Sequence, residues 1–251
     1  MKVLGIIPAR YHSSRLEGKP LADICDKPMI QRVYEQAKKA LDEVVVATDD
    51  QRIVEVVQGF GGQVIMTSSQ HNTGTNRCLE GYQKSGIKAQ IIINIQGDEP
   101  LLEPEQLHEI IGCFDDDSVD FATLAFTAKG EKPVDGNGVY VVLDNDLNAI
   151  CFSRSVIPHV GGKEKETWGD NHQFYKHVGM YAYTPKALAE FSKMEQTLLE
   201  KAESLEQLRW LENGNKIRVS ITKHETIAVD TPQDLERVRQ LIQQNTFHEK
   251  R

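Results

Sequence analysis

Residues 6–21, with the sequence IIPARYHSSRLEGKPL, join the end of an apolar run to a loop rich in cationic side chains. They continue an apolar run that begins at Val3, and such a run predicts a buried strand of an α/β sheet. Arg10, Arg15 and Lys19 follow the strand closely. Open α/β sheets bind ligands in the loops at the carboxyl ends of their strands. Cationic side chains and free backbone N–H groups in this loop therefore predict a site for a polyphosphate.

A Walker A loop is the first alternative, because Gly18 and Lys19 form the Gly-Lys pair of that motif. The motif requires a Ser or Thr next to bind Mg²⁺, whereas this chain has Pro20, which donates no N–H. A kinase or ATPase of that type is therefore not expected. Charge spacing alone leaves open a second alternative, a solvated basic turn.

The composition and net charge of the chain limit the classes of molecule that it is expected to bind. The chain has 251 residues, enough for one α/β domain with an elaboration, and a formal net charge of −8. An acidic chain without a domain-scale basic patch is not expected to bind nucleic acid. Its four cysteines are scattered without a C-x-x-C pair, which indicates reduced thiols and a cytoplasmic location. No signal peptide or apolar run of about 20 residues is visible, so no membrane partner is expected.

The first half of the chain alternates between strand and helix patterns. Strands are predicted at 3–7, 44–47, 64–66 and 91–95, and helices begin near Pro28, after Asp50 and at Cys78, the last with Thr75 as its cap. Such an alternation predicts a parallel sheet.

The second half changes character. A strand at 121–125 and a helix from Pro104 precede a polar loop at 129–138, and Asp144 opens a hairpin turn between strands 139–143 and 149–152. A strand at 175–183, an amphipathic helix at 203–213, a strand at 216–222 and a helix after Thr231 complete the pattern. We predict a single domain spanning 1–251, with an elaboration at about 129–183.

Two aspartates complete the predicted site. Asp98 follows the apolar strand 91–95 and Asp230 follows the strand-like run 227–229, so both are expected at the same sheet edge as Lys19. Two carboxylates beside a phosphate-binding loop are what Mg²⁺ requires, because the ion completes its shell with phosphate and water oxygens. The alternative for either aspartate alone is a turn or capping role, and for Asp230 Thr231 fills the capping role better.

Seven segments, in this order, resemble the signature of the 3-deoxy-manno-octulosonate (KDO) cytidylyltransferases, also called CMP-KDO synthetases. They are IPARYHSSRLEGKPL, HNTGTNR, NIQGDEP, CFSRSVIP, YKHVGMYAY, SLEQLRWLENG and VDTPQDLERV. The resemblance implies an α/β fold with a mostly parallel Rossmann-like sheet flanked by helices, of the nucleotide-diphospho-sugar transferase type. It also implies a small β-rich elaboration used for dimerisation and sugar-acid binding. The implied activity is a Mg²⁺-dependent transfer from CTP to a 2-keto-3-deoxy sugar acid, in a homodimer and in lipopolysaccharide biosynthesis.

The resemblance also implies roles for individual residues. Arg10, Lys19 and Asp98 are the expected catalytic residues, and Asp98 and Asp230 the expected metal ligands. The expected nucleotide-binding residues are Pro8, Ala9, Arg10, Arg15, Lys19, Gly74, Thr75 and Arg77. The expected sugar-acid-binding residues are Gln96, Arg154, His177, Tyr181, Glu206 and Gln207. A structural ion pair is the alternative role for Arg154, and packing is the alternative for His177.

Three positions depart from the family pattern. Glu17 stands where Pro is common, Asn76 where Asp or Glu is usual, and Tyr140 where Lys is common. The departures leave the predicted phosphate and metal residues intact, but they leave the sugar acid open. KDN, another nonulosonate or 8-amino KDO would share the reacting end of KDO. A sugar-nucleotide-binding protein without catalysis is the alternative from a different class.

Overall fold

We describe the chain from a computed structural model, in which residues 1–13, 15–128 and 138–249 are described. The predicted loop at 129–138 lies outside these residues except for Gly138. The chain forms two compact units, residues 1–107 with 226–251 and residues 108–225. The helix α4 (Pro104–Gly112) carries the chain from the first unit into the second. The prediction of one domain stays a prediction, and each unit is described by itself.

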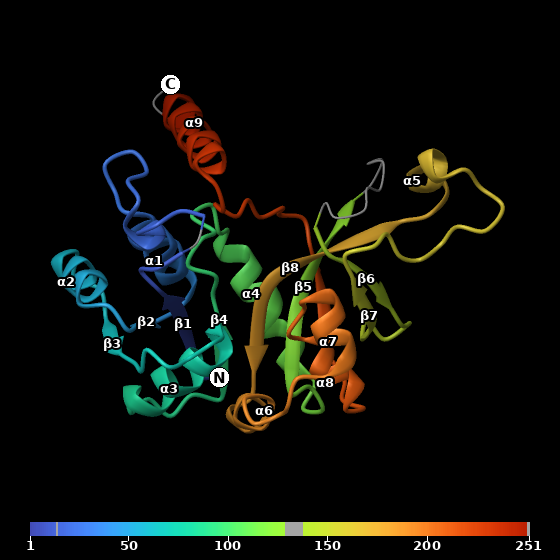
Figure 1. The fold of residues 1–251 in the computed structure, drawn as a ribbon, viewed down its shortest axis with the longest axis horizontal. Helices are drawn as coiled ribbons and strands as arrows, with labels where there is room; N and C mark the ends of the chain where they lie inside the picture. The colour runs from blue at the N-terminus through green and yellow to red at the C-terminus, as the bar shows by residue number, and fades with distance from the viewer. Residues whose placement is uncertain (14, 129–137, 250–251) are drawn as a thin grey trace. The chain divides into compact units, whose positions relative to one another are not determined.

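The first unit is built on a parallel sheet in the order β3–β2–β1–β4, as the strand and helix alternation predicts. Figure 1 shows this unit from dark blue to teal, with its last helix in red. Its elements are β1 (Val3–Ala9), α1 (Met29–Ala40), β2 (Glu43–Thr48), α2 (Gln51–Gly59), β3 (Val64–Met66), α3 (Gly74–Ser85), β4 (Ile91–Asn94) and α9 (Pro232–Glu249), with a 3₁₀ turn at Lys19–Leu21.

Helices cover both faces of β1 because adjacent side chains of a strand point in opposite directions. Ile6 faces α3, where Gly81 leaves room for it and for Ala47. Ile7 lies on the other face, near Ile30 of α1. Three of the four strands, β1, β2 and β4, are almost completely buried, so burial of Val, Ile and Leu side chains is the main source of stability here.

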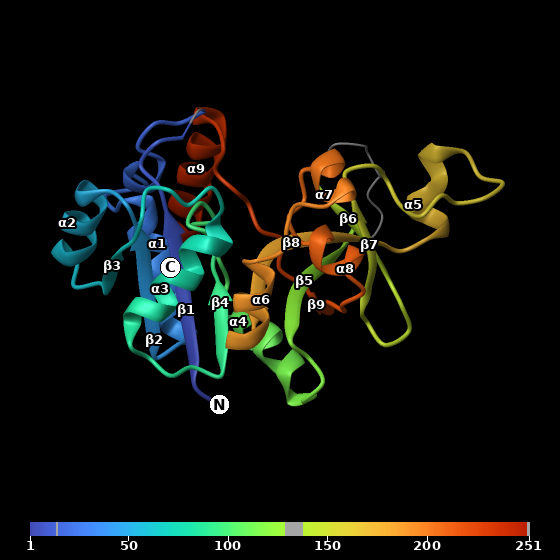
Figure 2. The same cartoon turned by 60° about the horizontal axis from the view of Figure 1, so that its bottom comes forward.

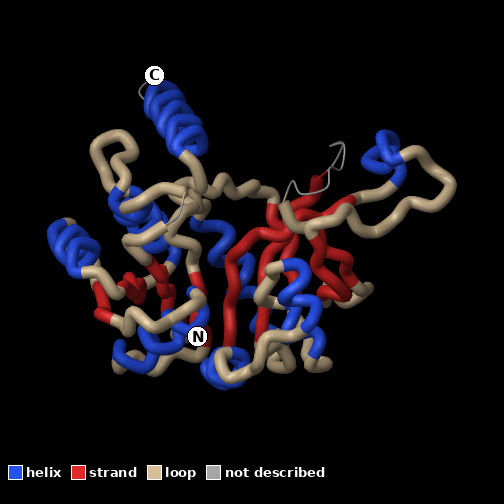
Figure 3. Tube along the Cα trace, viewed as in Figure 1, coloured by secondary structure: helices blue, strands red, loops and turns tan. Residues whose placement is uncertain are grey.

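The strands of the second unit, drawn red like all strands in Figure 3, pair in mixed directions. β5 pairs antiparallel with β8 and parallel with β9, while β6 pairs antiparallel with β7 and β8. Figure 2 shows the short helices α6, α7 and α8 of this unit beside its strands. Its elements are β5 (Phe121–Ala128), β6 (Tyr140–Leu143), β7 (Ala149–Ser153), α5 (Trp168–Asn171), β8 (Phe174–Tyr183), α6 (Pro185–Phe191), α7 (Leu198–Glu203), α8 (Leu208–Glu212) and β9 (Arg218–Thr222), with 3₁₀ turns at Cys113–Asp115 and Lys165–Thr167.

Two predicted helix boundaries are wrong. The helix expected at 203–213 is limited to α8 at Leu208–Glu212, because Glu203 is the last residue of α7 and Ser204 after it has a left-handed backbone conformation with φ +54°. The helix expected from Cys78 begins at Gly74, and its cap is Thr73 rather than Thr75. The Thr73 hydroxyl accepts a hydrogen bond from the backbone N–H of Asn76 at 3.2 Å.

A strained two-residue turn precedes α1. Ile24 N–H donates to the Lys27 carbonyl at 2.8 Å, and the residues between them, Cys25 and Asp26, have φ values of +51° and +66°. Positive φ at both central residues is characteristic of a type I′ turn, in which glycine is favoured at the second position. Arg32 holds the turn by donating to the carbonyls of Ile24 and Cys25.

Asp26→Gly is expected to raise the free energy of unfolding by about 0.5–1 kcal/mol, because glycine adopts positive φ without a Cβ penalty. Urea denaturation of the variant and the parent protein measures this difference. Asp42→Gly is the control, since the same change outside a left-handed turn is expected to destabilise or to have no effect. A less stable Asp26→Gly variant would contradict the strain argument.

Candidate functional site

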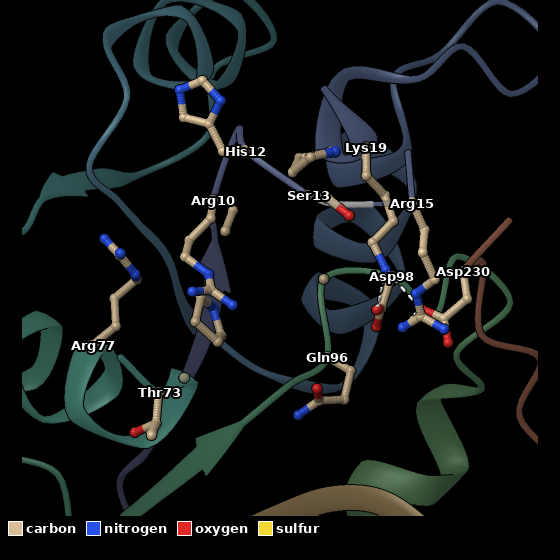
Figure 4. Close-up of a pocket in the computed structure, with 15 residues that line it drawn as sticks. Arg10, His12, Ser13, Arg15, Lys19, Thr73, Arg77, Gln96, Asp98 and Asp230 are labelled. Carbon is tan, nitrogen blue, oxygen red and sulfur yellow. Dashed lines mark hydrogen bonds and ion pairs between the residues drawn. The ribbon is translucent and has the colours of Figure 1, made fainter. Parts of the chain in front are cut away.

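A cavity of about 560 Å³ lies in the first unit, where β1 and β4 end and α3 begins. Figure 4 shows its side chains, with cations on several sides of a common space and two carboxylates at one end. Most of the residues predicted for the first unit line it. The lining residues are Pro8, Ala9, Arg10, His12, Ser13, Arg15, Lys19, Pro20, Thr73, Gly74, Arg77, Gln96, Gly97, Asp98 and Asp230.

Lys19 lies between the two predicted metal ligands. Its Nζ donates to Asp98 Oδ2 at 2.6 Å and to Asp230 Oδ1 at 3.1 Å, and Arg15 donates to the same Asp230 oxygen at 3.0 Å (Figure 4). Lys19 is the most buried of the three cations predicted for this loop, with 15% of its side chain exposed. Three segments distant in sequence thus bring one ammonium and two carboxylates together, as their predicted positions at one sheet edge require.

Arg10 has a different environment. Among the residues that the structure describes, its exposed guanidinium makes no hydrogen bond or ion pair with the protein. In Figure 4 it extends from the end of β1 into the space between Arg77 and the Lys19 cluster. Because its five N–H donors are uncommitted, Arg10 is available to bind an anionic group in the cavity.

The backbone places Asp98 and Asp230 beside each other. The Val229 N–H donates to the Asp98 carbonyl at 2.9 Å, so residue 230 is held next to residue 98 although the run 227–229 forms no strand, contrary to the prediction. Gly97 allows a close approach in the same turn, because a Cβ there would lie 3.2 Å from the Pro8 carbonyl oxygen, closer than most Cβ contacts. The predicted capping role of Thr231 is confirmed, since its hydroxyl accepts from the Asp234 N–H.

The first turn of α3 forms the opposite wall. Thr73 and Gly74 line the cavity, and the unpaired N–H groups at a helix start favour anionic ligands. Arg77 also lines it, but its guanidinium is buried and donates to Asp49 at 2.9 Å and to Thr67 at 2.6 Å. Thr75 is buried and does not line the cavity, so the structure does not support the predicted contact through its side chain.

Glu99, next to Asp98, is a buried carboxyl that the sequence did not single out. Burial raises the pKa of Glu99 to about 8, with a further contribution from the negative charge of Asp98. At neutral pH Glu99 is therefore mostly protonated. It does not add a third negative charge to the pair formed by Asp98 and Asp230.

The remaining predicted residues belong to the second unit. Arg154 donates to the carbonyls of Glu203 and Ser204 at the end of α7, so its guanidinium satisfies carbonyls that a helix end leaves unpaired. Glu203 in turn accepts from the backbone N–H of Arg154 and from the Ser153 hydroxyl. These are contacts with backbone carbonyls and not the structural ion pair given as the alternative, and the sugar-acid role of Arg154 stays a prediction.

His177, Tyr181 and Gln207 form a polar cluster in this unit. The rings of His177 and Tyr181 lie 5.4 Å apart between centroids, and the Tyr181 hydroxyl donates to Gln207 Oε1 at 3.2 Å. The Thr123 hydroxyl donates to the Met180 carbonyl at 2.7 Å, so its oxygen accepts from His177 Nε2 at 2.9 Å. That assignment makes Nε2 the protonated nitrogen of a neutral imidazole. Glu206, the last predicted residue, lies 3.7 Å from the Arg209 guanidinium.

Burial lowers the pKa of His177 to about 3, well below the value of about 6.5 for a free histidine. The folded state therefore binds fewer protons than the unfolded state between pH 6.5 and pH 3. The contribution of His177 to stability is complete above pH 6.5 and is lost as the pH falls, by up to about 1.4 kcal/mol per pH unit. Denaturation of the parent protein and of His177→Asn at pH 7.5, 6.0 and 5.0 is expected to give a stability difference that shrinks with pH. The exposed His108→Asn is the control, and a difference for His177→Asn that is constant with pH would be contrary to this expectation.

Two of the departures are explained by their surroundings. Tyr140 is fully buried in a cluster with Val156, Trp168 and Phe174, so it is a core residue. Glu17 has 72% of its side chain exposed and lies 3.9 Å from His12. Sequence reasoning missed the role of Thr73, although a threonine directly before glycine at a helix start was the available signal.

Known proteins are similar to this chain over most of its length. The family model described as cytidylyltransferase matches residues 4–217. A protein of Parabacteroides distasonis named 3-deoxy-manno-octulosonate cytidylyltransferase is 54% identical over 94% of this chain and 96% of its own length. One of Phocaeicola vulgatus with the same name is 50% identical, over 97% and 98%. A solved structure of CMP:2-keto-3-deoxy-manno-octonic acid synthetase complexed with CTP superposes with a TM-score of 0.90 and 42% identity, covering 98% of this chain and all of the other.

Proposed function

The chain belongs to the cytidylyltransferase family, among the 3-deoxy-manno-octulosonate cytidylyltransferases, and from this we propose that it transfers the cytidylyl group of CTP to KDO. The observation that carries the proposal is the convergence of Lys19, Asp98 and Asp230 in one cavity that also receives the free guanidinium of Arg10. A triphosphate needs such an arrangement of cations, and a bound divalent cation needs the carboxylates.

In the proposed reaction the anomeric hydroxyl of the sugar acid attacks the α-phosphorus of CTP. A new P–O bond forms to that oxygen, the bond between the α-phosphorus and the bridging oxygen breaks, and pyrophosphate leaves with the electron pair. The hydroxyl proton is released to solvent or to the leaving phosphate. The protein supplies position and positive charge rather than a covalent intermediate, and Lys19 and Arg10 are its cations for the charge that gathers on the phosphates.

Mg²⁺ fits the residues present. Asp98 and Asp230 already hold one cationic group between them, the Lys19 ammonium, so their oxygens converge on a space where positive charge is stabilised. No group of three or more His, Cys, Asp or Glu side chains suited to a metal occurs in the described part of the chain. Two carboxylates with phosphate and water oxygens match the preference of Mg²⁺, which retains several waters. When bound, the ion would neutralise phosphate charge.

The sugar-acid side is also part of the proposal. Gln96 lines the cavity with the cations, and the other five candidates lie in the second unit. Tyr140 does not support a different sugar acid, because its side chain is buried in the core rather than available to a ligand. We therefore favour KDO over a nonulosonate or 8-amino KDO.

A pyrophosphate-release assay tests this proposal. The protein is mixed with CTP and MgCl₂ and with KDO, 8-amino KDO, KDN or N-acetylneuraminate in turn, and KDO is expected to give the highest kcat/KM. Turnover with none of these acids, together with measurable binding of CTP, would favour a binding protein without catalysis. Equal kcat/KM values for all four would remove the assignment of KDO.

Arg10→Met is expected to raise KM for CTP by about ten- to a hundred-fold, since a hydrogen bond to a charged group contributes about 1.5–3 kcal/mol. Steady-state kinetics at saturating sugar acid measure the effect. Arg239→Met, which removes an arginine that holds the Asp23 carbonyl, is the control for loss of one positive charge in the same unit. An Arg10→Met variant with the parent KM would exclude Arg10 from phosphate binding.

We further propose a homodimer in the cytoplasm. The exposed apolar side chains Leu147, Ile150 and Leu198 of the second unit are groups that a subunit interface would cover. The cysteines are free in the described residues, which is consistent with a reducing compartment. None of the described helices has the length and apolar character that crossing a bilayer requires. Light scattering of the purified protein tests the dimer.

A further inference from the structure

Arg52, at the start of α2, packs on the phosphate-binding loop without belonging to the cavity. Its guanidinium carbon lies 3.3 Å from the centroid of the Tyr11 ring, and Tyr11 is the residue directly after Arg10. Cation–π stacking of this kind favours arginine, because the planar guanidinium lies against the face of the ring. Arg52 does not line the cavity, so its position indicates an influence on the loop rather than on a ligand.

Asp50 fixes the orientation of the guanidinium. Arg52 Nε and Nη2 donate to the two Asp50 oxygens at 2.9 and 2.6 Å, which is a bidentate pair. The same carboxylate caps α2 by accepting from the backbone N–H of Arg52 at 2.9 Å. These hydrogen bonds lower the pKa of Asp50. The guanidinium plane is thus tied to the first turn of a helix, which is a rigid support.

The Tyr11 ring transmits this support to the other end of the loop. The Gly18 N–H donates to the Tyr11 carbonyl at 3.0 Å, and a Cβ at Gly18 would lie 3.2 Å from the ring. Gly18 has φ +68°, and Lys19 follows it directly. The ring therefore lies against the residue before Lys19 on one side and follows Arg10 on the other. Arg52 stacks on this ring, and the ring connects the positions of Arg10 and Lys19.

We propose that Arg52 is a positioning residue for CTP, which acts through the Tyr11 ring to hold Arg10 and Lys19 in their binding positions. It acts on the protein before CTP arrives, so its contribution is to affinity for the nucleotide and not to the chemical step. The inference rests on the proposed function in taking CTP as the ligand.

Equilibrium binding of CTP in the presence of MgCl₂, measured by calorimetry without sugar acid, tests the inference. Arg52→Met keeps the backbone N–H that Asp50 caps and is expected to weaken CTP binding about two- to five-fold, the range for one exposed cation–π contact. In steady-state assays KM for CTP rises by the same factor and kcat is unchanged. Arg52→Lys keeps the charge but not the bidentate pair, and it is expected to recover only part of the affinity.

A double-mutant cycle with Tyr11→Leu separates the ring from the charge of Arg52. If Arg52 acts through the ring, Arg52→Met has little further effect on CTP affinity in the Tyr11→Leu background. An equal effect in both backgrounds means that Arg52 acts by long-range charge alone, and this overturns the inference, as does parent affinity in Arg52→Met. Failure of the proposed function gives a different result, since the parent protein then releases no pyrophosphate with any sugar acid while the CTP-binding cycle is still measurable.

Discussion

Replacing Asp98 with asparagine is expected to lower kcat for CMP-KDO formation by about a thousand-fold, with little change in the folded structure. The asparagine side chain keeps the shape of the carboxyl group and still accepts a hydrogen bond from Lys19. It loses the negative charge that the proposed metal site requires, and electrostatic stabilisation of phosphate charge is the main contribution that this cavity offers. Pyrophosphate release at saturating CTP and KDO over a series of MgCl₂ concentrations measures the loss.

The control is Glu103→Gln, which neutralises an exposed carboxylate near Asp98 in sequence and is expected to keep parent activity. Thermal melting of both variants separates loss of catalysis from loss of folding. If Asp98→Asn retains more than a tenth of the parent kcat, Asp98 is not a metal ligand. The roles of Asp230 and Lys19 would then need another explanation.

Arg209→Leu is expected to lower the free energy of unfolding by about 3–5 kcal/mol, because it leaves the Glu200 carboxylate buried without its partner. Arg209 and Glu200 are 5% and 4% exposed. The Arg209 guanidinium donates with two nitrogens to both Glu200 oxygens, one of them at 2.8 Å, and with the third to the Met194 carbonyl at 3.1 Å. The pair joins α7 to α8 across the break at Ser204.

The double variant Glu200→Met with Arg209→Leu tests the cause. Removing both charges leaves no unpaired ion, so it is expected to recover most of the stability that Arg209→Leu loses. Urea denaturation of the parent, the two single variants and the double variant gives the coupling between them. Equal stability of Arg209→Leu and the parent protein would show that the pair does not hold the two helices together.

The sequence predicted the first unit well because its pattern has a direct physical meaning. Apolar runs at β1, β2, β3 and β4 are separated by helix-length segments, and a parallel sheet follows from this alternation. The meeting of Lys19, Asp98 and Asp230 followed from the same logic, since strands of a parallel sheet end at one edge. The sequence therefore predicted that these side chains meet, although it gave no distances between them.

The errors lie where local backbone conformation decides. Thr73 and Thr75 are both acceptable caps by residue type, and only the φ and ψ angles at Thr73 distinguish them. Ser204 has no sequence signal for a left-handed conformation, so the end of α7 at Glu203 and the start of α8 at Leu208 were not predictable. The role of Arg154 rests on a resemblance between motifs and stays a prediction, and its contacts with helix-end carbonyls could not be predicted from those motifs.

The close approach of Gly97 to the Pro8 carbonyl oxygen determines which substitutions near the cavity would change its shape. Because residue 97 has no side chain, its approach to the main chain of β1 sets the distance between the first strand and the turn that carries Asp98. A Cβ at position 97 would require the Pro8 carbonyl or the turn that carries Asp98 to shift by a few tenths of an ångström. The width of the anionic end of the cavity is thus set by the approach of two stretches of main chain, and position 97 is where a substitution would change it.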